Sequence, residues 1–100
     1  MKRARRTGLL DLSEQGISSV PDEVFRLSGL DVLYLTHNAL SKLPDEISQL
    51  TALKVLYLHN NRFAQFPQST CNLSSLTWLN LNNNQLDAIP PEVCKNLDVY

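Results

Sequence analysis

The stretch Leu30–Leu53 reads LDVLYLTHNALSKLPDEISQLTAL and decides the fold of this chain. Its leucines and its proline recur every 23 residues, as from Leu33 to Leu56, so the same pattern repeats along most of the 100-residue sequence. The repeating columns are Leu10, Leu33, Leu56 and Leu79; Leu12, Leu35, Leu58 and Leu81; and Pro21, Pro44, Pro67 and Pro90. A fixed period in this range is typical of a solenoid, in which each repeat is one structural unit stacked on the next.

Each repeat opens with a short segment of alternating character, of which Val32–Thr36 is the clearest example. Period-two alternation is typical of a β-strand, here with two leucines facing a core and their neighbours facing outward. Because a return segment and an equivalent strand follow each strand, the stacked copies must form a parallel sheet, and such crossovers are nearly always right-handed. We therefore predict an α/β repeat fold: a right-handed solenoid in a horseshoe arc, with the parallel sheet on its concave side.

The proline of each repeat marks the start of the return segment. It holds φ at about −65° and biases the residue before it toward extended geometry, which ends the inner turn. In Asp45–Leu50 the residues after the proline are two acids and then apolar side chains three apart. Acids in a first turn complement the partial positive charge of a helix start. The convex side is therefore predicted to consist of short helical or 3-10 segments.

The sequence divides into a basic N-terminal arm at 1–6 and a repeat domain at 7–100. About four repeats are expected, at 7–29, 30–52, 53–75 and 76–100. The last is predicted to be incomplete or uncapped, because Asn96 occupies a slot that is apolar elsewhere and Val99 falls in the slot that opens a repeat. An uncapped repeat exposes an apolar side, so self-association through the C-terminal end is one hypothesis.

One polar column follows the strands, at the point where the chain turns inward. Its members are Gln15, Asn38, Asn61 and Asn84. A side-chain amide satisfies backbone groups that such a turn leaves open, and stacked amides are also able to bond one another. We interpret this column as a structural ladder, with Gln15 as the departure expected of a terminal repeat.

The outward-facing strand residues are not needed for the core, so their identity is informative. They place two tyrosines and a tryptophan over a floor of valines, edged by His, Thr and Asn. Aromatic side chains with one polar atom are enriched in interface hot spots. The candidate partner-binding residues are Val32, Tyr34, Thr36, Val55, Tyr57, His59, Trp78, Asn80 and Asn82. The competing interpretation is that the aromatic rings only cover the sheet through cross-strand packing.

Composition argues against several functional classes. The net charge is −1, with 19% charged residues, so no overall basic field attracts nucleic acid. No apolar run approaches the roughly 20 residues that span a membrane. The arm carries Lys2, Arg3, Arg5 and Arg6, and the apolar core of a signal peptide does not follow it. We predict a cytoplasmic protein, with nuclear import through the arm as the alternative.

Residues that could carry chemistry are few. His37 and His59 make two ligands, whereas zinc sites need three or four, and no Cys/His dyad forms because the cysteines lie in return segments. Cys71 and Cys94 occupy the same slot of consecutive repeats, so stacking could bring them together. A chain without a secretory signal is nevertheless expected to keep them reduced. We predict no enzymatic activity, no metal and no cofactor.

With these columns and its Leu-Pro step, the chain resembles the leucine-rich-repeat family over about residues 7–93. Within the family it resembles the intracellular class with a 23-residue repeat, which includes Ras suppressor protein and the plant Ras-group-related leucine-rich-repeat proteins. The resemblance implies a non-enzymatic signalling scaffold that binds a partner protein on its concave face. Two alternatives remain: the N-terminal recognition segment of a larger kinase, GTPase or receptor, and a fragment that self-associates end to end.

Overall fold

Five short strands and three 3-10 helices alternate along residues 8–86 and 98–100, which are the residues that the computed structural model describes. The expected basic arm at 1–6 and the last return segment, with Cys94 and Asn96, lie outside the described residues. The elements are β1 (Leu9–Asp11), η1 (Asp22–Arg26), β2 (Val32–Tyr34), η2 (Asp45–Gln49), β3 (Val55–Tyr57), η3 (Gln68–Asn72), β4 (Trp78–Asn80) and β5 (Asp98–Val99).

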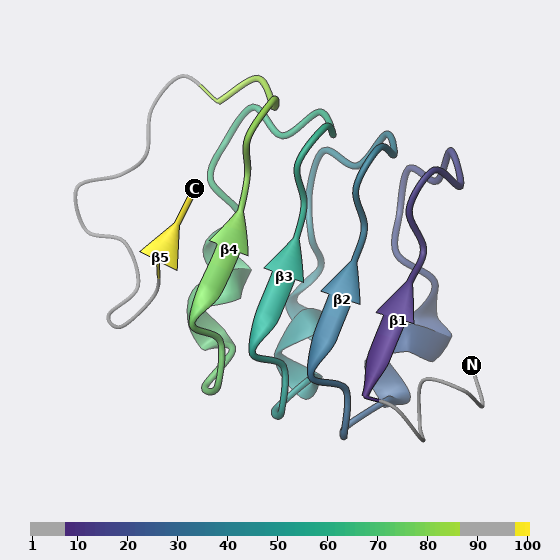
Figure 1. Cartoon of the computed structure of the whole chain (residues 1–100), viewed down its shortest axis with the longest axis vertical. Helices are drawn as coiled ribbons and strands as arrows, with labels where there is room; N and C mark the ends of the chain where they lie inside the picture. Colours follow the sequence, from purple (N-terminus) through teal and green to yellow (C-terminus); the bar gives the residue numbers. More distant parts are fainter. Residues whose placement is uncertain (1–7, 87–97) are drawn as a thin grey trace.

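The strands form one open parallel sheet in the order β1-β2-β3-β4-β5 (Figure 1). From β1 to β4 the register follows the repeat, so that Leu33 pairs with Leu56 and Leu56 pairs with Leu79. Backbone bonds such as Leu35 N–H to the Tyr57 carbonyl, 2.9 Å, extend the ladder beyond the strand ends. The predicted parallel solenoid sheet is confirmed.

The convex segments are the 3-10 helices η1 to η3, each of which starts directly after a proline. Pro21, Pro44 and Pro67 have φ of −59°, −73° and −75°, so they enter the helix with the dihedral that their ring imposes. Each helix is five residues long, and the following leucine donates its N–H back into it. The prediction of short helical or 3-10 return segments is confirmed.

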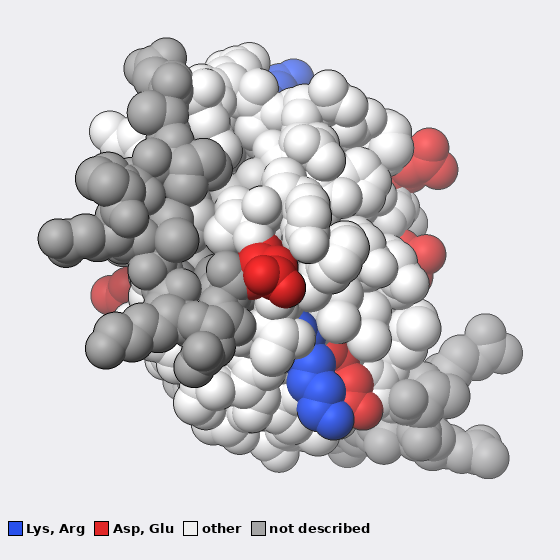
Figure 2. Space-filling view, turned by 60° about the vertical axis from the view of Figure 1, so that its left-hand side comes forward, with Lys and Arg blue, Asp and Glu red and all other residues white. Residues whose placement is uncertain are grey.

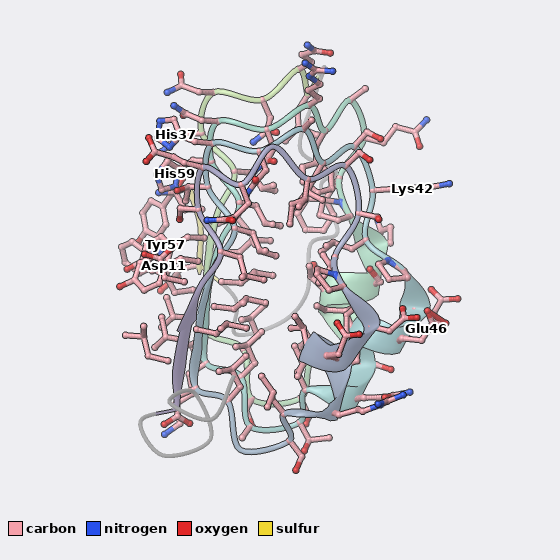
Figure 3. The ribbon with its side chains drawn as sticks, turned by 90° about the vertical axis from the view of Figure 1, so that its right-hand side faces the viewer. Asp11, His37, Lys42, Glu46, Tyr57 and His59 are labelled. Carbon is pink, nitrogen blue, oxygen red and sulfur yellow. The ribbon has the colours of Figure 1, made fainter. Side chains whose placement is uncertain are left out.

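A continuous aliphatic core fills the space between the sheet and the helices (Figure 3). The inward leucines Leu33, Leu35, Leu56 and Leu58 are fully buried. Phe63 is also fully buried where other repeats carry an aliphatic residue, so the ring is part of this core. The leucine columns therefore give each repeat its cohesion with its neighbours.

The asparagines of the polar column share one arrangement. The Oδ1 atom of Asn38, Asn61 and Asn84 accepts backbone N–H groups of the preceding repeat. The Nδ2 atom donates to carbonyls of the preceding strand and of its own strand. Within the described residues these amides bond the backbone and not one another. Gln15 is exposed and its Nε2 reaches only the Ser13 carbonyl, at 3.3 Å.

The register of β5 differs from the expectation. Leu79 pairs with Leu56 on one side and with Val99 on the other. Val99 follows Leu79 by fewer residues than Leu79 follows Leu56. Val99 therefore occupies the inward strand column and not the slot that opens a repeat. Because the last strand arrives early, Tyr100 lies beside Asn80 on the outward face.

The cysteine prediction is wrong on one point, because Cys71 is disulfide-bonded. Cys94, the chain's only other cysteine, lies outside the described residues. Cys71 is exposed on the convex side, on η3. Disulfides persist in oxidising environments, whereas the predicted cytoplasm is reducing. The localisation stays a prediction.

Candidate functional site

The outward residues of the strands form one face of the molecule, opposite the helices. In Figure 3 the side chains of Tyr57 and His59 project from the sheet side, whereas Lys42 and Glu46 project from the other side. The register places the candidate binding residues in three rows across the strands. From β1 to β4 the rows are Leu9, Val32, Val55, Trp78; Asp11, Tyr34, Tyr57, Asn80; and Ser13, Thr36, His59, Asn82.

Two aromatic stacks dominate this face. The rings of Tyr34 and Tyr57 are parallel within 1°, with centroids 4.6 Å apart. Trp78 stacks on Tyr100, with centroids 4.3 Å apart and an interplanar angle of 28°. The two stacked tyrosines are half-buried, and Trp78 is 36% exposed. Sequence reasoning did not include Tyr100 in the site, because the regular period does not predict the early return of β5.

The remaining candidates differ in how far solvent reaches them. Val32 and Val55 are half-buried and lie side by side as the floor. Thr36 is only 6% exposed, and its hydroxyl donates to the Ser13 hydroxyl at 2.9 Å. Thr36 therefore holds two repeats together and offers little to a partner. His59 and Asn80 are half-exposed, and Asn82 is exposed.

A chain of side-chain hydrogen bonds runs along one edge of the face. Asn83 Nδ2 donates to Asn60 Oδ1 at 3.0 Å, and Asn60 Nδ2 lies 2.8 Å from His37 Nε2. In the tautomer that carries its proton on Nδ1, His37 Nε2 accepts this hydrogen bond from Asn60. These three residues have positive φ, between 55° and 60°, and each comes directly before a ladder asparagine. The side chains along this edge thus bond one another.

His59 lies next to this edge, and its side chain makes fewer hydrogen bonds than the edge side chains do. Its Nδ1 atom is buried and has no hydrogen-bond partner. Its ring meets Tyr57 and His37 edge to face, with both centroid distances 6.0 Å. Burial lowers the pKa of His59, and repulsion from the neighbouring His37 when that ring is protonated lowers it further. Both effects favour the neutral imidazole.

This pKa shift predicts how stability depends on pH. In the unfolded chain the pKa of a histidine is about 6.5, so below that pH the unfolded state binds more protons than the folded state at His59. The free energy of unfolding is expected to fall as the pH drops from 6.5 through the folded pKa, and the contribution of His59 is complete above pH 6.5. The effect is small, because His59 is partly exposed.

Urea denaturation at a series of pH values measures this contribution. The control is His59→Thr, which introduces the residue that Thr36 supplies in the preceding repeat. Wild type should lose stability relative to the variant below pH 6.5 and run parallel to it above. Parallel curves over the whole range would contradict the assignment.

Charge is sparse on the sheet side, and Figure 2, which takes in part of that side, shows mostly uncharged surface there. The three rows contain one charged residue, Asp11, and no Lys or Arg. The pKa of Asp11 is lowered by hydrogen bonds from the side chain and the backbone of Ser13. Glu14 and Asp98 add two acids at opposite ends of the described sheet. The face therefore offers aromatic, amide and hydroxyl groups, with little charge.

The described residues offer no metal centre and no membrane segment. They hold no cluster of three or more His, Cys, Asp or Glu side chains that could bind an ion. None of their helices is long and apolar enough to cross a bilayer. Two hollows, of about 450 and 280 Å³, lie on the helix side and meet at Lys42, and no candidate binding residue lines them.

The sequence comparisons identify the fold family. A family model described as leucine rich repeat matches residues 6–63 and 51–99, which together span nearly the whole chain. The chain belongs to the leucine-rich-repeat family. No curated protein sequence matches it. The predicted family is therefore confirmed, whereas the narrower resemblance to Ras suppressor protein stays a prediction.

Solved leucine-rich-repeat structures superpose on this one. The leucine-rich-repeat domain of the type III effector XCV3220 (XopL) has a TM-score of 0.76 at 26% identity and covers 98% of this chain and 38% of its own. The Leptospira interrogans protein LIC12759 has a TM-score of 0.61 at 29% identity and covers 100% of this chain and 33% of its own. A Shigella effector domain, at 21% identity and a TM-score of 0.60, covers 98% and 50% and supports the fold alone.

The chain thus spans between a third and a half of the length of these structures. Leucine-rich-repeat domains are in general protein-interaction modules and typically have no catalytic activity of their own. Membership of the family therefore indicates the general kind of function. The chemistry of a binding surface depends on the outward residues of this chain.

Proposed function

We propose that this leucine-rich-repeat chain is a non-enzymatic scaffold that binds a partner protein on its concave face. The centre of the interface is formed by Val32, Tyr34, Val55, Tyr57 and Trp78. The supporting observation is the aromatic surface on a sheet face that carries little charge. Trp78 remains 36% exposed although a ring stacks on it, and large exposed aromatics are more common at interfaces than elsewhere on a surface.

The stacking of Tyr34 on Tyr57 also agrees with the competing interpretation, in which the rings only cover the sheet. The two interpretations differ in whether the ring edges and hydroxyl groups are available to a partner. Rings stacked face to face across strands present their edges and hydroxyl groups to solvent. Tyrosine hydroxyls at the rim of an apolar patch are well suited to a protein partner, because they give both buried area and a hydrogen bond.

A capture experiment with a double variant tests the proposal. Tyr57→Ala with Trp78→Ala is expected to weaken partner binding about thirtyfold or more for each truncation, because a hot-spot side chain contributes about 2 kcal/mol or more. Wild type and the variant are immobilised and exposed to an extract of the source cells, and retained proteins are quantified by mass spectrometry. Thermal unfolding should remain cooperative in both.

The matched control is Lys42→Ala with Glu46→Ala, two exposed side chains on the helix side (Figure 3). Proteins retained by wild type and by this control, but lost from the aromatic variant, would support the concave assignment. Equal retention by all three proteins would overturn it.

A second candidate function is a recognition segment within a longer leucine-rich-repeat protein. It is favoured by the length of the matched structures, of which this chain covers between a third and a half. An antibody against the repeat domain distinguishes the two candidates on a denaturing gel of source cells. A band well above 11.3 kDa would support the second candidate, and a band at that mass would count against it.

A further inference from the structure

The end of η3 carries a three-residue motif that the concave face does not use. Asn72, Leu73 and Ser74 form the pattern Asn-X-Ser, with a residue other than proline in the middle, and the pattern occurs once in the sequence. It is the acceptor pattern for N-linked glycosylation, in which a bulky, hydrophilic glycan is attached to a surface asparagine. Because so short a pattern also arises by chance, the structure around it has to support the assignment.

The fold presents both required side chains to solvent. Asn72 is the last residue of η3, Ser74 lies in the turn that follows, and both are exposed. Leu73 lies between them with φ of −84° and ψ of 98°, and its side chain is buried in the core. Side chains on either side of an extended residue lie on the face opposite to its own. The amide of Asn72 and the hydroxyl of Ser74 are therefore accessible together.

Neither side chain contributes a hydrogen bond that holds the described fold together. The next hydroxyls along the chain do, since Ser75 donates to the Thr51 carbonyl at 2.8 Å and Thr77 donates to the Lys54 carbonyl at 3.3 Å. Within the described residues, no such bond is made by the side chains of Asn72 and Ser74. A glycan on Asn72 would thus displace no hydrogen bond of the described fold.

The other repeats show which part of the motif is specific to the third one. Ser28 and Thr51 occupy the position of Ser74, so a hydroxyl at this point of the turn belongs to the repeat. Arg26 and Gln49 occupy the position of Asn72, and both are exposed. The competing interpretation is that Asn72 is one more polar residue of the convex surface.

The residue before the motif separates the two interpretations. Cys71 is disulfide-bonded. Disulfides form and persist in oxidising compartments such as the lumen of the endoplasmic reticulum, and N-linked acceptor sites belong to surface segments of secreted proteins. The disulfide and the motif therefore require the same environment, which differs from the cytoplasm that the sequence predicts.

We propose that Asn72 carries an N-linked glycan on the convex side of the solenoid. Its Nδ2 atom forms a bond to C1 of the first sugar of an oligosaccharide that is linked to a lipid diphosphate. The bond from C1 to the diphosphate oxygen breaks, the lipid diphosphate leaves with the bonding electrons, and one proton passes from Nδ2 to a base of the transferring enzyme. The Ser74 hydroxyl is the second group that this enzyme recognises.

The position of the glycan is compatible with a partner on the concave face. The 3-10 helices lie across the core from the outward strand face on which Tyr57 and His59 project (Figure 3). A glycan at the end of η3 therefore extends away from that face. The proposal does not depend on the proposed function.

Peptide mapping of the protein from its source cells tests the proposal. Trypsin releases residues 63–95 as one peptide, because Arg62 precedes it and Lys95 ends it. Peptide-N-glycosidase F in ¹⁸O-labelled water converts a glycosylated asparagine into an aspartate that carries the label. The label is expected at residue 72 and not at Asn82, an exposed asparagine of the same peptide outside the motif.

Three variants expressed in the same cells test the motif. Ser74→Ala keeps Asn72 but removes the hydroxyl, so the label should be lost, whereas Ser74→Thr should retain it. Ser28→Ala changes the equivalent exposed position of the first repeat and is the matched control, which should be labelled as wild type is. Circular dichroism should show the same fold in all three, because exposed turn positions have little effect on stability.

An unlabelled Asn72 in the wild-type protein, or a label that persists in Ser74→Ala, would overturn the proposal. Either result is distinguishable from a failure of the proposed function. Partner capture that requires Tyr57 and Trp78 would still stand, and only the glycan would be removed from this account.

Discussion

Replacing Phe63 with alanine is expected to lower the free energy of unfolding by about 3–5 kcal/mol, the range for removing a buried aromatic ring. Phe63 is fully buried in the core shared by consecutive repeats. The aromatic ring fills a column that holds aliphatic side chains elsewhere, so truncation leaves a cavity that neighbouring leucines cannot close. Chemical denaturation followed by circular dichroism measures the loss.

Phe63→Leu is the matched control, because Leu40 and Leu86 occupy the equivalent position in the neighbouring repeats. A leucine should restore most of the lost stability, with a residual cost under about 2 kcal/mol. Equal destabilisation by the two variants would show that the ring is needed for more than its volume and would contradict this account.

Replacing Asn61 with alanine is expected to cost about 3 kcal/mol, although the side chain contributes little apolar area. Asn61 is 7% exposed. Its Nδ2 donates to the carbonyls of Leu35 and Leu58 at 2.8 and 3.0 Å, and its Oδ1 accepts the Leu40 N–H at 3.0 Å. Alanine would leave several buried backbone groups without partners, each of which carries a desolvation cost.

Asn82→Ala provides the comparison, because Asn82 is an exposed asparagine whose side chain makes no hydrogen bond within the described residues. Its substitution should change stability by less than about 0.5 kcal/mol. Thermal or urea unfolding of both variants separates the two roles. A stable Asn61→Ala protein would show that water replaces the amide in the inner turn, and the ladder would then not be structural.

Both substitutions are expected to have large consequences because the solenoid is short. Each repeat contacts only its neighbours, so stability is approximately a sum of repeat and interface contributions. A domain typically has a free energy of unfolding of about 5–15 kcal/mol. Losing the packing of one repeat therefore removes a large fraction of it. We expect unfolding to begin near the altered repeat and to remove its neighbours' interfaces as well.

The sequence alone determined the parallel sheet, the leucine core and the convex turns. These features follow from local rules that recur in every repeat. An inward leucine, a turn asparagine and a proline each act within one repeat or on the adjacent one, so a period read along the chain is also a period in space. Leu33, Asn61 and Pro44 could therefore be assigned their environments without coordinates.

Tertiary structure decided the features that depend on how the chain departs from this period. The early return of β5 brings Tyr100 beside Asn80 and onto Trp78, and Cys71 is disulfide-bonded. Hydrogen bonding among outward side chains left Asn80 with an unused donor. The repeat specifies which face a residue lies on, but contacts between side chains on that face depend on register and rotamer, which no sequence period encodes.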